Sequence, residues 1–430
     1  MMTNSASEVA ANRSVAPLRL LMVCSQAPYP PNHGGAVDMW RRIEAFYDAG
    51  VELDLLCWTS ESLSIAQQEA FAARFGVVNA LVIGRTLHYR LPRVLQLYRY
   101  PLAIALRSLS RSASRDLVYR IGLRKPDAVW LDGIGGGRIA ERIADSLNVP
   151  LIMRSHNIEH RYWARQARLA TSVPDSVRHM LRAAHLKRFE SHILRRSDRY
   201  YDISLDDLNY WRSEGLNHGA WLPPLAAKWL AESPTATRST ATHDLVFLGN
   251  LRMPNNVAGL QWFAAEVLPR VIPHLPGLSV LIAGSDPSEA IVKLCNATAG
   301  VSLLANPAHA HDVLQAGKVL VNPVLDGSGV AIKSIDMLFV DRVRISTLQG
   351  VHGLPAMARD CFFVAETAEE FAGAIILALK QDLVPPGDVL QAREAFDPKS
   401  IGRVVSDIQT LAKGAMQPKD LIPNALPRGQ

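Results

Sequence analysis

Short apolar runs alternate with longer amphipathic stretches along most of the chain. Residues 18–25 (LRLLMVCS) form a continuous apolar run, which is typical of a strand covered on both faces in a parallel sheet. After a turn-rich segment we expect a helix over 36–49, ended by Gly50, and a second strand over 51–58. This strand–helix–strand opening predicts an α/β fold.

The same alternation continues to about residue 222 and then begins again. In the first part we expect strands at 80–83, 128–131, 151–154 and 198–204 and helices at 138–147 and 177–196. In the second part we expect strands at 244–248, 278–283, 319–323, 343–347 and 361–364 and helices at 256–272, from 333, and at 368–379. The alternation of strands and helices in each part therefore predicts a doubly wound, Rossmann-like domain.

A chain of 430 residues is longer than a single hydrophobic core usually accommodates, so two domains are expected. A polar stretch with several prolines separates them, as in a linker. The expected organisation is a disordered leader (1–17), an N-terminal domain (18–222), a linker (223–243), a C-terminal domain (244–390), a C-terminal helix packing back toward the N-terminal domain (391–413) and a flexible tail (414–430).

Composition and cysteine spacing favour a cytoplasmic location. Hydrophobic residues make up 48% of the chain and charged residues 20%, and no run of about 18 apolar residues lacks a charge. The first 17 residues lack the apolar core of a signal peptide. The four cysteines (Cys24, Cys57, Cys295 and Cys361) are far apart, which argues against a zinc site and against a disulfide framework.

Positive charge is concentrated in residues 85–125. This segment has ten Arg or Lys residues and one acid, Asp116, which gives 10 − 1 = +9, whereas the whole chain has a net charge of +6. Apolar residues lie between the arginines, a pattern that suits an anionic membrane surface and favours a peripheral location at the inner face of a membrane. The alternative is a solvated helix face. No nucleic-acid-binding motif accompanies the charge, so no nucleic-acid partner is expected.

The segment from Pro323 to Asp336 (PVLDGSGVAIKSID) has the pattern of a strand end, a Gly-rich turn and a helix start. Gly327 and Gly329 allow the backbone to approach a ligand closely, Ser328 can donate a hydrogen bond, and Lys333 adds a cation. With the backbone N–H groups of a helix start, these residues suit a diphosphate. The alternative is an ordinary tight loop with a solvated lysine.

Ligands of open parallel sheets bind beyond the carboxyl ends of the strands. The loops expected there are rich in Gly, Asn, Pro and Ser, and they are 30–35, 249–255, 284–287 and 326–333. A dinucleotide-binding fingerprint is incomplete, because Ile332 and Arg138 stand where its third glycine belongs. No Walker sequence and no Asp-x-Asp metal motif occurs, so neither a metal nor a cofactor is expected.

Several segments together resemble the retaining glycosyltransferases of family 4, whose GT-B architecture has two facing Rossmann-like domains and a cleft between them. The matching segments are the opening 18–35, Arg154 to Glu159 (RSHNIE), Ser204 to Asp207 (SLDD), Phe247 to Asn256 (FLGNLRMPNN), Pro323 to Lys333, and Thr347 with Gly350, Gly353 and Leu354. The resemblance covers most of the chain and implies transfer of a sugar from a nucleotide-sugar to a glycan or lipid-linked acceptor in envelope polysaccharide synthesis.

The resemblance also implies roles for individual residues. The catalytic set is His156, Lys333 and Arg252, with the two cations expected to stabilise the diphosphate leaving group. The donor-binding set is Gly249, Asn250, Gly284, Gly327, Ser328, Gly329 and Asp336, with Asp336 accepting from the ribose. The acceptor-binding set is Gly34, Gly35, Asn157 and Glu159. The alternative for His156 is a helix N-terminal histidine paired with Glu159.

The chain departs from the family pattern at the donor loop. Ser328 and Asp336 stand where many members have two glutamates, and Asp341 and Val343 replace a glycine and a proline. Asp336, Asp341 and Val343 favour the other hypothesis, a non-catalytic GT-B-like protein with a degenerate donor site.

Overall fold

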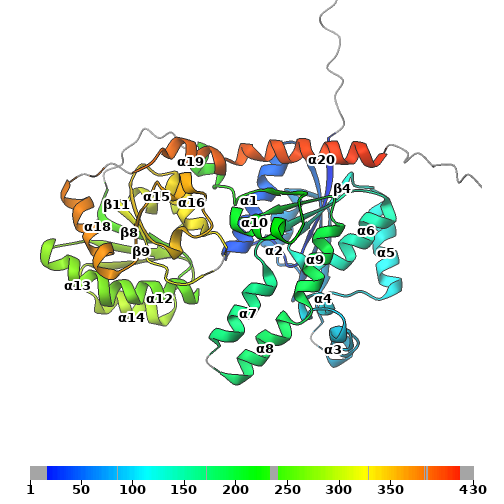
Figure 1. Cartoon of the computed structure of the whole chain (residues 1–430), viewed down its shortest axis with the longest axis horizontal. Coiled ribbons are helices and arrows are strands. Elements are labelled where there is room, and N and C mark those ends of the chain that lie inside the picture. The colour runs from blue at the N-terminus through cyan, green and yellow to red at the C-terminus, as the bar shows by residue number, and fades with distance from the viewer. Residues whose placement is uncertain are drawn as a thin grey trace, which may run out of the picture.

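The computed structural model describes residues 17–84, 86–170, 172–232, 241–327, 329–381, 383 and 386–416. The chain forms two domains side by side, each built on a parallel sheet with helices around it (Figure 1). The expected leader, apart from Pro17, and most of the expected tail lie outside the described residues, and so does Ser328.

The N-terminal sheet has seven parallel strands in the order β3-β2-β1-β4-β5-β6-β7. The strands are β1 (Arg19–Cys24), β2 (Glu52–Thr59), β3 (Phe75–Val82), β4 (Ala128–Asp132), β5 (Leu151–Ser155), β6 (Arg199–Asp202) and β7 (Gly219–Trp221). The first strand is an interior strand of the sheet, between β2 and β4. Its carboxyl end therefore lies within the domain's ligand-binding edge.

The continuous apolar run of β1 is explained by burial on both faces of the sheet. Leu21 and Val23 join one hydrophobic core, whereas Leu20 and Met22 join the core on the opposite face. Successive side chains of a strand point to opposite faces, so the five buried positions of β1, residues 20–24, are all apolar.

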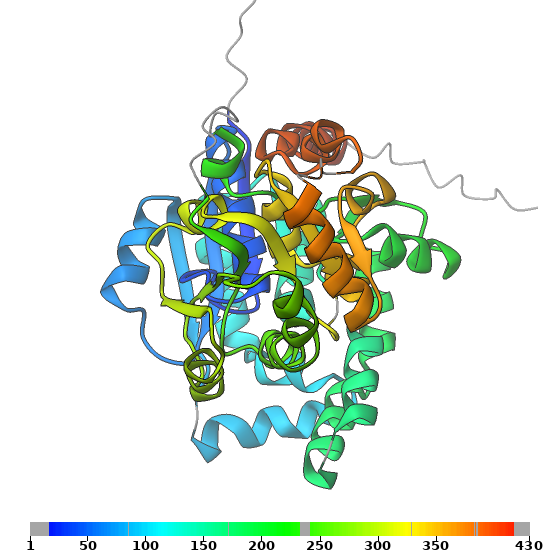
Figure 2. The ribbon, with the colours of Figure 1, turned by 90° about the vertical axis from the view of Figure 1, so that its left-hand side faces the viewer.

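The helices of the N-terminal domain cover both faces and also extend below the sheet (Figures 1 and 2). They are α1 (Gly34–Asp48), α2 (Ile65–Ala72), α3 (Leu87–Val94), α4 (Leu102–Leu106), α5 (Arg111–Gly122), α6 (Gly137–Leu147), α7 (Glu159–Leu169), α8 (Val173–Ala183), α9 (Leu186–Arg196) and α10 (Leu205–Ser213).

The C-terminal sheet has six parallel strands in the order β10-β9-β8-β11-β12-β13. The strands are β8 (His243–Leu248), β9 (Val280–Gly284), β10 (Val301–Ala305), β11 (Gly317–Asn322), β12 (Val343–Thr347) and β13 (Phe363–Ala365). The helices are α11 (Lys228–Glu232), α12 (Pro254–Trp262), α13 (Leu268–Val271), α14 (Glu289–Ala297), α15 (Ala310–Gln315), α16 (Ile332–Leu338), α17 (Ala356–Arg359) and α18 (Ala368–Gln381).

The chain then returns across the N-terminal domain. Two helices, α19 (Val389–Phe396) and α20 (Ile401–Met416), stand where one helix over 391–413 was expected. Asp397 and Pro398 separate them, because proline has no backbone N–H to continue the helix. Ile401 and Ile408 of α20 are buried in the N-terminal core, and α20 runs along the top of that domain in Figure 1.

Three other expectations differ from the structure. The helix expected over 177–196 is two helices, since His185 takes a left-handed conformation (φ 60°) between α8 and α9. Strands β7 and β10 were missed: β7 has only three residues, and β10 is an edge strand with mostly exposed side chains, so it lacks a continuous buried run. The expected linker contains helix α11 and the first residue of β8. None of the helices among the described residues is long and apolar enough to cross a membrane.

Candidate functional site

A cleft of about 1000 Å³ lies between the carboxyl ends of the two sheets. Loops from both domains line it, as the topology of parallel sheets requires. The residues expected from the sequence that line it are Gly34, Gly35, Gly249, Asn250, Gly327, Gly329, Lys333 and Asp336. Segments about 300 residues apart in the chain therefore form one site.

Two cations line this cleft, Arg41 and Lys333, and Lys333 is the one without a carboxylate partner among the described residues. Its amine donates a hydrogen bond to the side-chain oxygen of Asn256 and lies 4.8 Å from the centre of the Phe247 ring. No carboxylate among the described residues forms an ion pair with it, and burial lowers the pKa of Lys333 to about 7. An anion bound beside Lys333 would favour the charged amine and remove this cost of burial.

The Gly-rich loop meets the N-terminal domain at Asn157. Gly329 has a left-handed backbone (φ 68°), and a Cβ placed there would lie 2.9 Å from the side-chain oxygen of Asn157. Glycine is therefore required both by the backbone conformation and by the space. A residue expected to bind the acceptor and one expected to bind the donor are thus brought into contact.

The loop after β8 also makes a contact between the two domains. The Asn250 side-chain amide donates to the carbonyl of Asn32 at 2.8 Å, and its oxygen accepts from the backbone N–H of Arg252 at 2.9 Å. Gly284 does not line the cleft, but a Cβ there would lie 1.6 Å from the carbonyl oxygen of Gly249. Its role in the structure is to let these two loops pack closely.

Arg252 is not placed as expected. Its guanidinium is about two-thirds exposed, does not line the cleft, and pairs with Asp286 at 2.7 Å. The loop that places Asn250 in the cleft turns the Arg252 side chain toward the neighbouring loop after β9. Lys333 therefore remains without the second cation that the sequence suggested.

Asp336 is held by an arginine of the other domain. Both of its carboxylate oxygens accept from Arg41 of α1 at 2.8 Å, and both side chains are mostly buried (13% and 16% exposed). Arg41 also donates to the carbonyl of Leu225, in the segment that joins the domains, at 3.2 Å. The acid expected to contact a ribose thus has an interdomain partner in this structure.

We expect Arg41→Gln and Asp336→Asn each to destabilise the folded chain, with a coupling between them of about 1–3 kcal/mol, because a bidentate pair with little solvent exposure is screened weakly. Denaturant unfolding of the two single variants and the double variant measures this coupling. The exposed pair Lys228–Asp48 (49% and 42% exposed) is the control, for which we expect less than about 1 kcal/mol. Additive effects of Arg41→Gln and Asp336→Asn would contradict the prediction.

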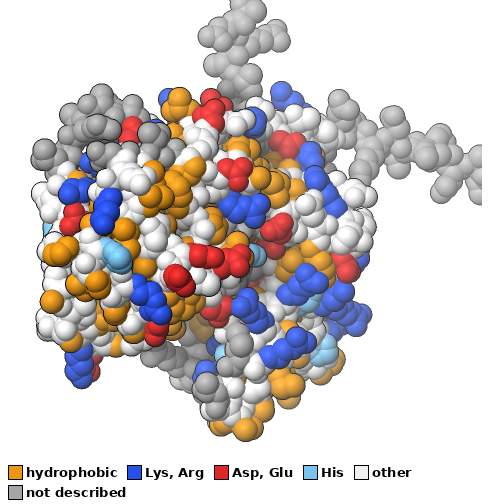
Figure 3. Space-filling model, turned by 60° about the vertical axis from the view of Figure 1, so that its left-hand side comes forward, with side chains coloured by type: hydrophobic (Ala, Val, Ile, Leu, Met, Phe, Trp, Pro, Cys, Tyr) orange, Lys and Arg blue, Asp and Glu red, His pale blue; other side chains and the backbone are white. Residues whose placement is uncertain are grey.

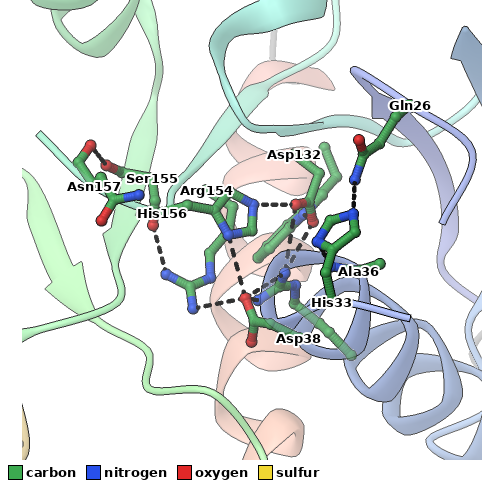
Figure 4. A network of polar contacts seen from close by, with 11 residues as sticks. Gln26, His33, Ala36, Asp38, Asp132, Arg154, Ser155, His156 and Asn157 are labelled. Carbon is green, nitrogen blue, oxygen red and sulfur yellow. Dashed lines mark hydrogen bonds and ion pairs between the residues drawn. The ribbon is translucent and has the colours of Figure 1, made fainter. Parts of the chain in front are cut away.

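His156 belongs to a buried ionic cluster at the base of the N-terminal domain's binding edge (Figure 4). Its Nε2 lies 2.5 Å from Asp132 and its Nδ1 lies 3.4 Å from Asp38. Arg42 pairs with both carboxylates, at 3.0 and 3.1 Å, and Arg154 pairs with Asp38 at 3.3 Å. Asp38, Asp132 and both arginines are at most 1% exposed, so the cluster is shielded from water.

The cluster determines the charge of His156. Burial alone would lower the pKa of His156, but Asp132 and Asp38 raise it above its usual value. The imidazole does not line the cleft, although its backbone carbonyl lies beside Gly329. The ion pairs of His156 are with Asp132 and Asp38, whereas the alternative expected its pair to be Glu159, on which His156 acts only by lowering the Glu159 pKa.

Glu159 begins α7 and is half-buried. Its carboxylate accepts from the indole N–H of Trp163 at 3.1 Å, and burial together with Glu190 raises the pKa of Glu159 to about 7. A carboxyl group with a pKa near neutrality is common at functional sites. Tyr162 and Gln166, on the same helix, line the cleft.

Sequence reasoning missed the partners that define these sites. Asn256 and Phe247 lay inside a recognised motif, but nothing in the sequence indicated that both would contact Lys333. Arg42 follows Asp38 by four residues on α1, a helical spacing that signals a pair. For Arg41 and Asp336, 295 residues apart, no such signal exists.

No metal site is found in the part of the chain that the structure describes, where no group of three or more His, Cys, Asp or Glu side chains is arranged to hold an ion.

The chain is similar in sequence to an "uncharacterized 44.6 kDa protein in cps region" of Klebsiella pneumoniae. The two are 24% identical over 376 residues, which are 83% of this chain and 90% of that protein. No protein-family model matches the chain.

Solved structures share the architecture over almost their whole length. TarM aligns with a TM-score of 0.62 and 10% identity, over 91% of this chain and 98% of TarM. HepE of Anabaena, in complex with UDP and glucose, aligns with a TM-score of 0.55 and 12% identity, over 92% of this chain and 98% of HepE. Sucrose-phosphate synthase of Thermosynechococcus elongatus aligns with a TM-score of 0.56 and 12% identity, over 92% and 97%. The predicted fold class, two facing Rossmann-like domains of GT-B type, is confirmed.

Proposed function

We propose that this protein is a glycosyltransferase that moves a sugar from a nucleotide-sugar donor to a glycan or lipid-linked acceptor with retention of anomeric configuration. The observation that carries the proposal is Lys333, a cation in the interdomain cleft with no carboxylate partner among the described residues. A neighbour of the same fold, HepE, is known in complex with UDP and with UDP-glucose. The cps-region relative supports a role in polysaccharide synthesis.

In the proposed reaction the bond between the anomeric carbon and the phosphate oxygen breaks. A new bond forms from that carbon to the acceptor oxygen, and the proton of the acceptor hydroxyl leaves to a phosphate oxygen or to solvent. The departing diphosphate gains negative charge, so stabilising it is the main catalytic demand. Lys333 supplies the charge, and Ala331 and Ile332 at the uncapped start of α16 line the cleft beside it.

Acceptor binding is assigned to the N-terminal side of the cleft. Gly34 and Gly35 line it at the start of α1, Asn157 meets the Gly-rich loop, and Glu159 begins the helix that carries Tyr162 and Gln166. His156 lies behind this wall with both ring nitrogens facing carboxylates. Its proposed role is to hold the Asn157 loop in place beside the donor.

A second candidate is a GT-B-like protein that binds a ligand without catalysing transfer. The Arg41–Asp336 pair favours it, because Asp336 already has a partner.

Calorimetry with UDP, GDP and ADP tests the proposal. We expect one of the three diphosphates to bind in the cleft, and the matching nucleotide-sugar to be hydrolysed slowly without acceptor. Binding without hydrolysis or transfer to any glycan would favour the second candidate. Failure of all three diphosphates to bind would overturn both.

A further inference from the structure

We propose that the lower end of the N-terminal domain is a docking surface for an anionic lipid bilayer, formed by α3 with its extension η1 (Leu95–Tyr98) and by α8. Exposed apolar side chains define this docking surface. They are Leu91, Val94, Leu95 and Tyr98 on the first helix and Val173, Val177, Met180 and Leu181 on the second.

The two sets of apolar side chains form stripes. Their spacings, 91-94-95-98 and 173-177-180-181, place each set on one face of its helix. Such a face is normally buried, yet Tyr98 is 79% and Val173 is 78% exposed. None of the described residues of α8 is buried.

Both helices are oriented with their polar side inward. Arg182 of α8 lies 4.5 Å from the ring of Trp163 on α7, and His179 lies 5.6 Å from the same ring. Arg93 of α3 donates to the carbonyl of Ser108 at 3.1 Å. The domain thus binds the polar sides of these helices and turns their apolar stripes to the outside.

The stripes are parts of one surface. Helix α4 contacts both α3 and α8, and the two helices lie at the same lower end of the domain in Figures 1 and 2. Orange side chains occupy the lowest point of the space-filling view in Figure 3, with blue ones above them. An amphipathic surface of this kind lies in the plane of a membrane interface, with its apolar side chains among the acyl chains.

Charge favours lipid over a protein partner. Residues 87–99 contain three arginines and no acid, and residues 160–183 contain five arginines and one acid, Asp175, and of these eight arginines Arg93 and Arg182 face the domain. Arg99, Arg168 and Arg178 are exposed. Arginines flanking an apolar patch suit the phosphate layer of an anionic leaflet, where their long side chains extend toward the head groups.

The position of the docking surface also indicates from which side a lipid-linked acceptor reaches the cleft, and this inference rests on the proposed function. Helix α7 runs from the cleft to α8, and its 11 residues span about 16 Å. A bilayer bound to α8 would therefore lie within about one helix length of Tyr162 and Gln166, which line the cleft. A lipid-linked acceptor would reach the cleft from that side.

Flotation of the full chain with vesicles tests the proposal. We expect binding to phosphatidylcholine vesicles that contain phosphatidylglycerol, weaker binding without it, and release as salt rises. Leu95→Ser with Met180→Ser, one change in each stripe, should reduce binding by about tenfold or more. Arg99→Gln with Arg168→Gln should reduce it by about fivefold for each cation.

The matched control is Leu377→Ser with Leu390→Ser, which alters two exposed leucines of the C-terminal domain and should leave vesicle binding unchanged. Nucleotide affinity is measured on the same samples. An unchanged affinity in the variants shows that they are folded, and the affinity of the parent chain tests the proposed function independently of vesicle binding. No binding to anionic vesicles at low salt would overturn the docking surface, and so would equal binding by the Leu95/Met180 variant. If the parent chain self-associates and the Leu95/Met180 variant does not, the surface would instead be assigned to contact with a second copy of the chain.

Discussion

Lys333→Ala is expected to weaken the binding of the nucleoside diphosphate by about ten- to a hundredfold. A hydrogen bond to a charged group contributes about 1.5–3 kcal/mol, and no other cation among the described residues lines the cleft without a carboxylate partner. Calorimetry measures the change. The melting temperature should stay equal or rise, because the variant removes an amine whose burial lowers its pKa.

The affinity should also depend on pH. The free protein has a Lys333 pKa of about 7, and the bound diphosphate favours the charged amine, so the affinity should be greatest below that pH and fall as the pH rises above it. A nucleotide-sugar is the better probe, since its diphosphate does not titrate near neutrality. In Lys333→Ala the slope should disappear.

The control for both measurements is Lys318→Ala. Lys318 is 58% exposed and pairs with Asp244 away from the cleft. Equal affinities of Lys333→Ala and the parent protein for the diphosphate would remove Lys333 from the site, and with it the observation on which the proposed function rests.

Arg42→Met is expected to destabilise the N-terminal domain by about 3–5 kcal/mol, because it leaves Asp38 and Asp132 buried with less compensating charge. At about 2–4 °C per kcal/mol, the melting temperature should fall by about 10 °C. Thermal unfolding followed by circular dichroism measures it. Arg42 and His156 lower the pKa values of both carboxylates against the effect of burial, that of Asp132 to about 2.

A matched control comes from an exposed pair with the same spacing. Asp116 and Arg120 are also four residues apart on one helix, but they are 64% and 52% exposed. Arg120→Met should therefore change stability by less than about 0.5 kcal/mol. Similar losses of stability in Arg42→Met and Arg120→Met would show that solvent reaches the buried cluster.

Much of the fold follows from local rules that the sequence contains. Residues 20–24 are apolar at every position because both faces of β1 are buried, and Gly327, Gly329 and Lys333 follow a strand, where ligands bind in parallel sheets. These features depend on neighbouring residues alone. They are enough to predict the two domains and the cleft-lining loops.

Tertiary structure decided which residues become partners. The sequence alone placed Arg252 with Lys333 and gave His156 to Glu159 or to the cleft, whereas the folded chain pairs Arg252 with Asp286 and His156 with Asp132. It joins Arg41 to Asp336 and turns the apolar stripe of α8 outward. Each outcome depends on how segments distant in the chain dock, because an ionic contact forms only within a few ångströms and loses most of its strength beyond that distance. The patterns that predict strands and helices do not specify the distances between side chains of segments that are far apart in the chain.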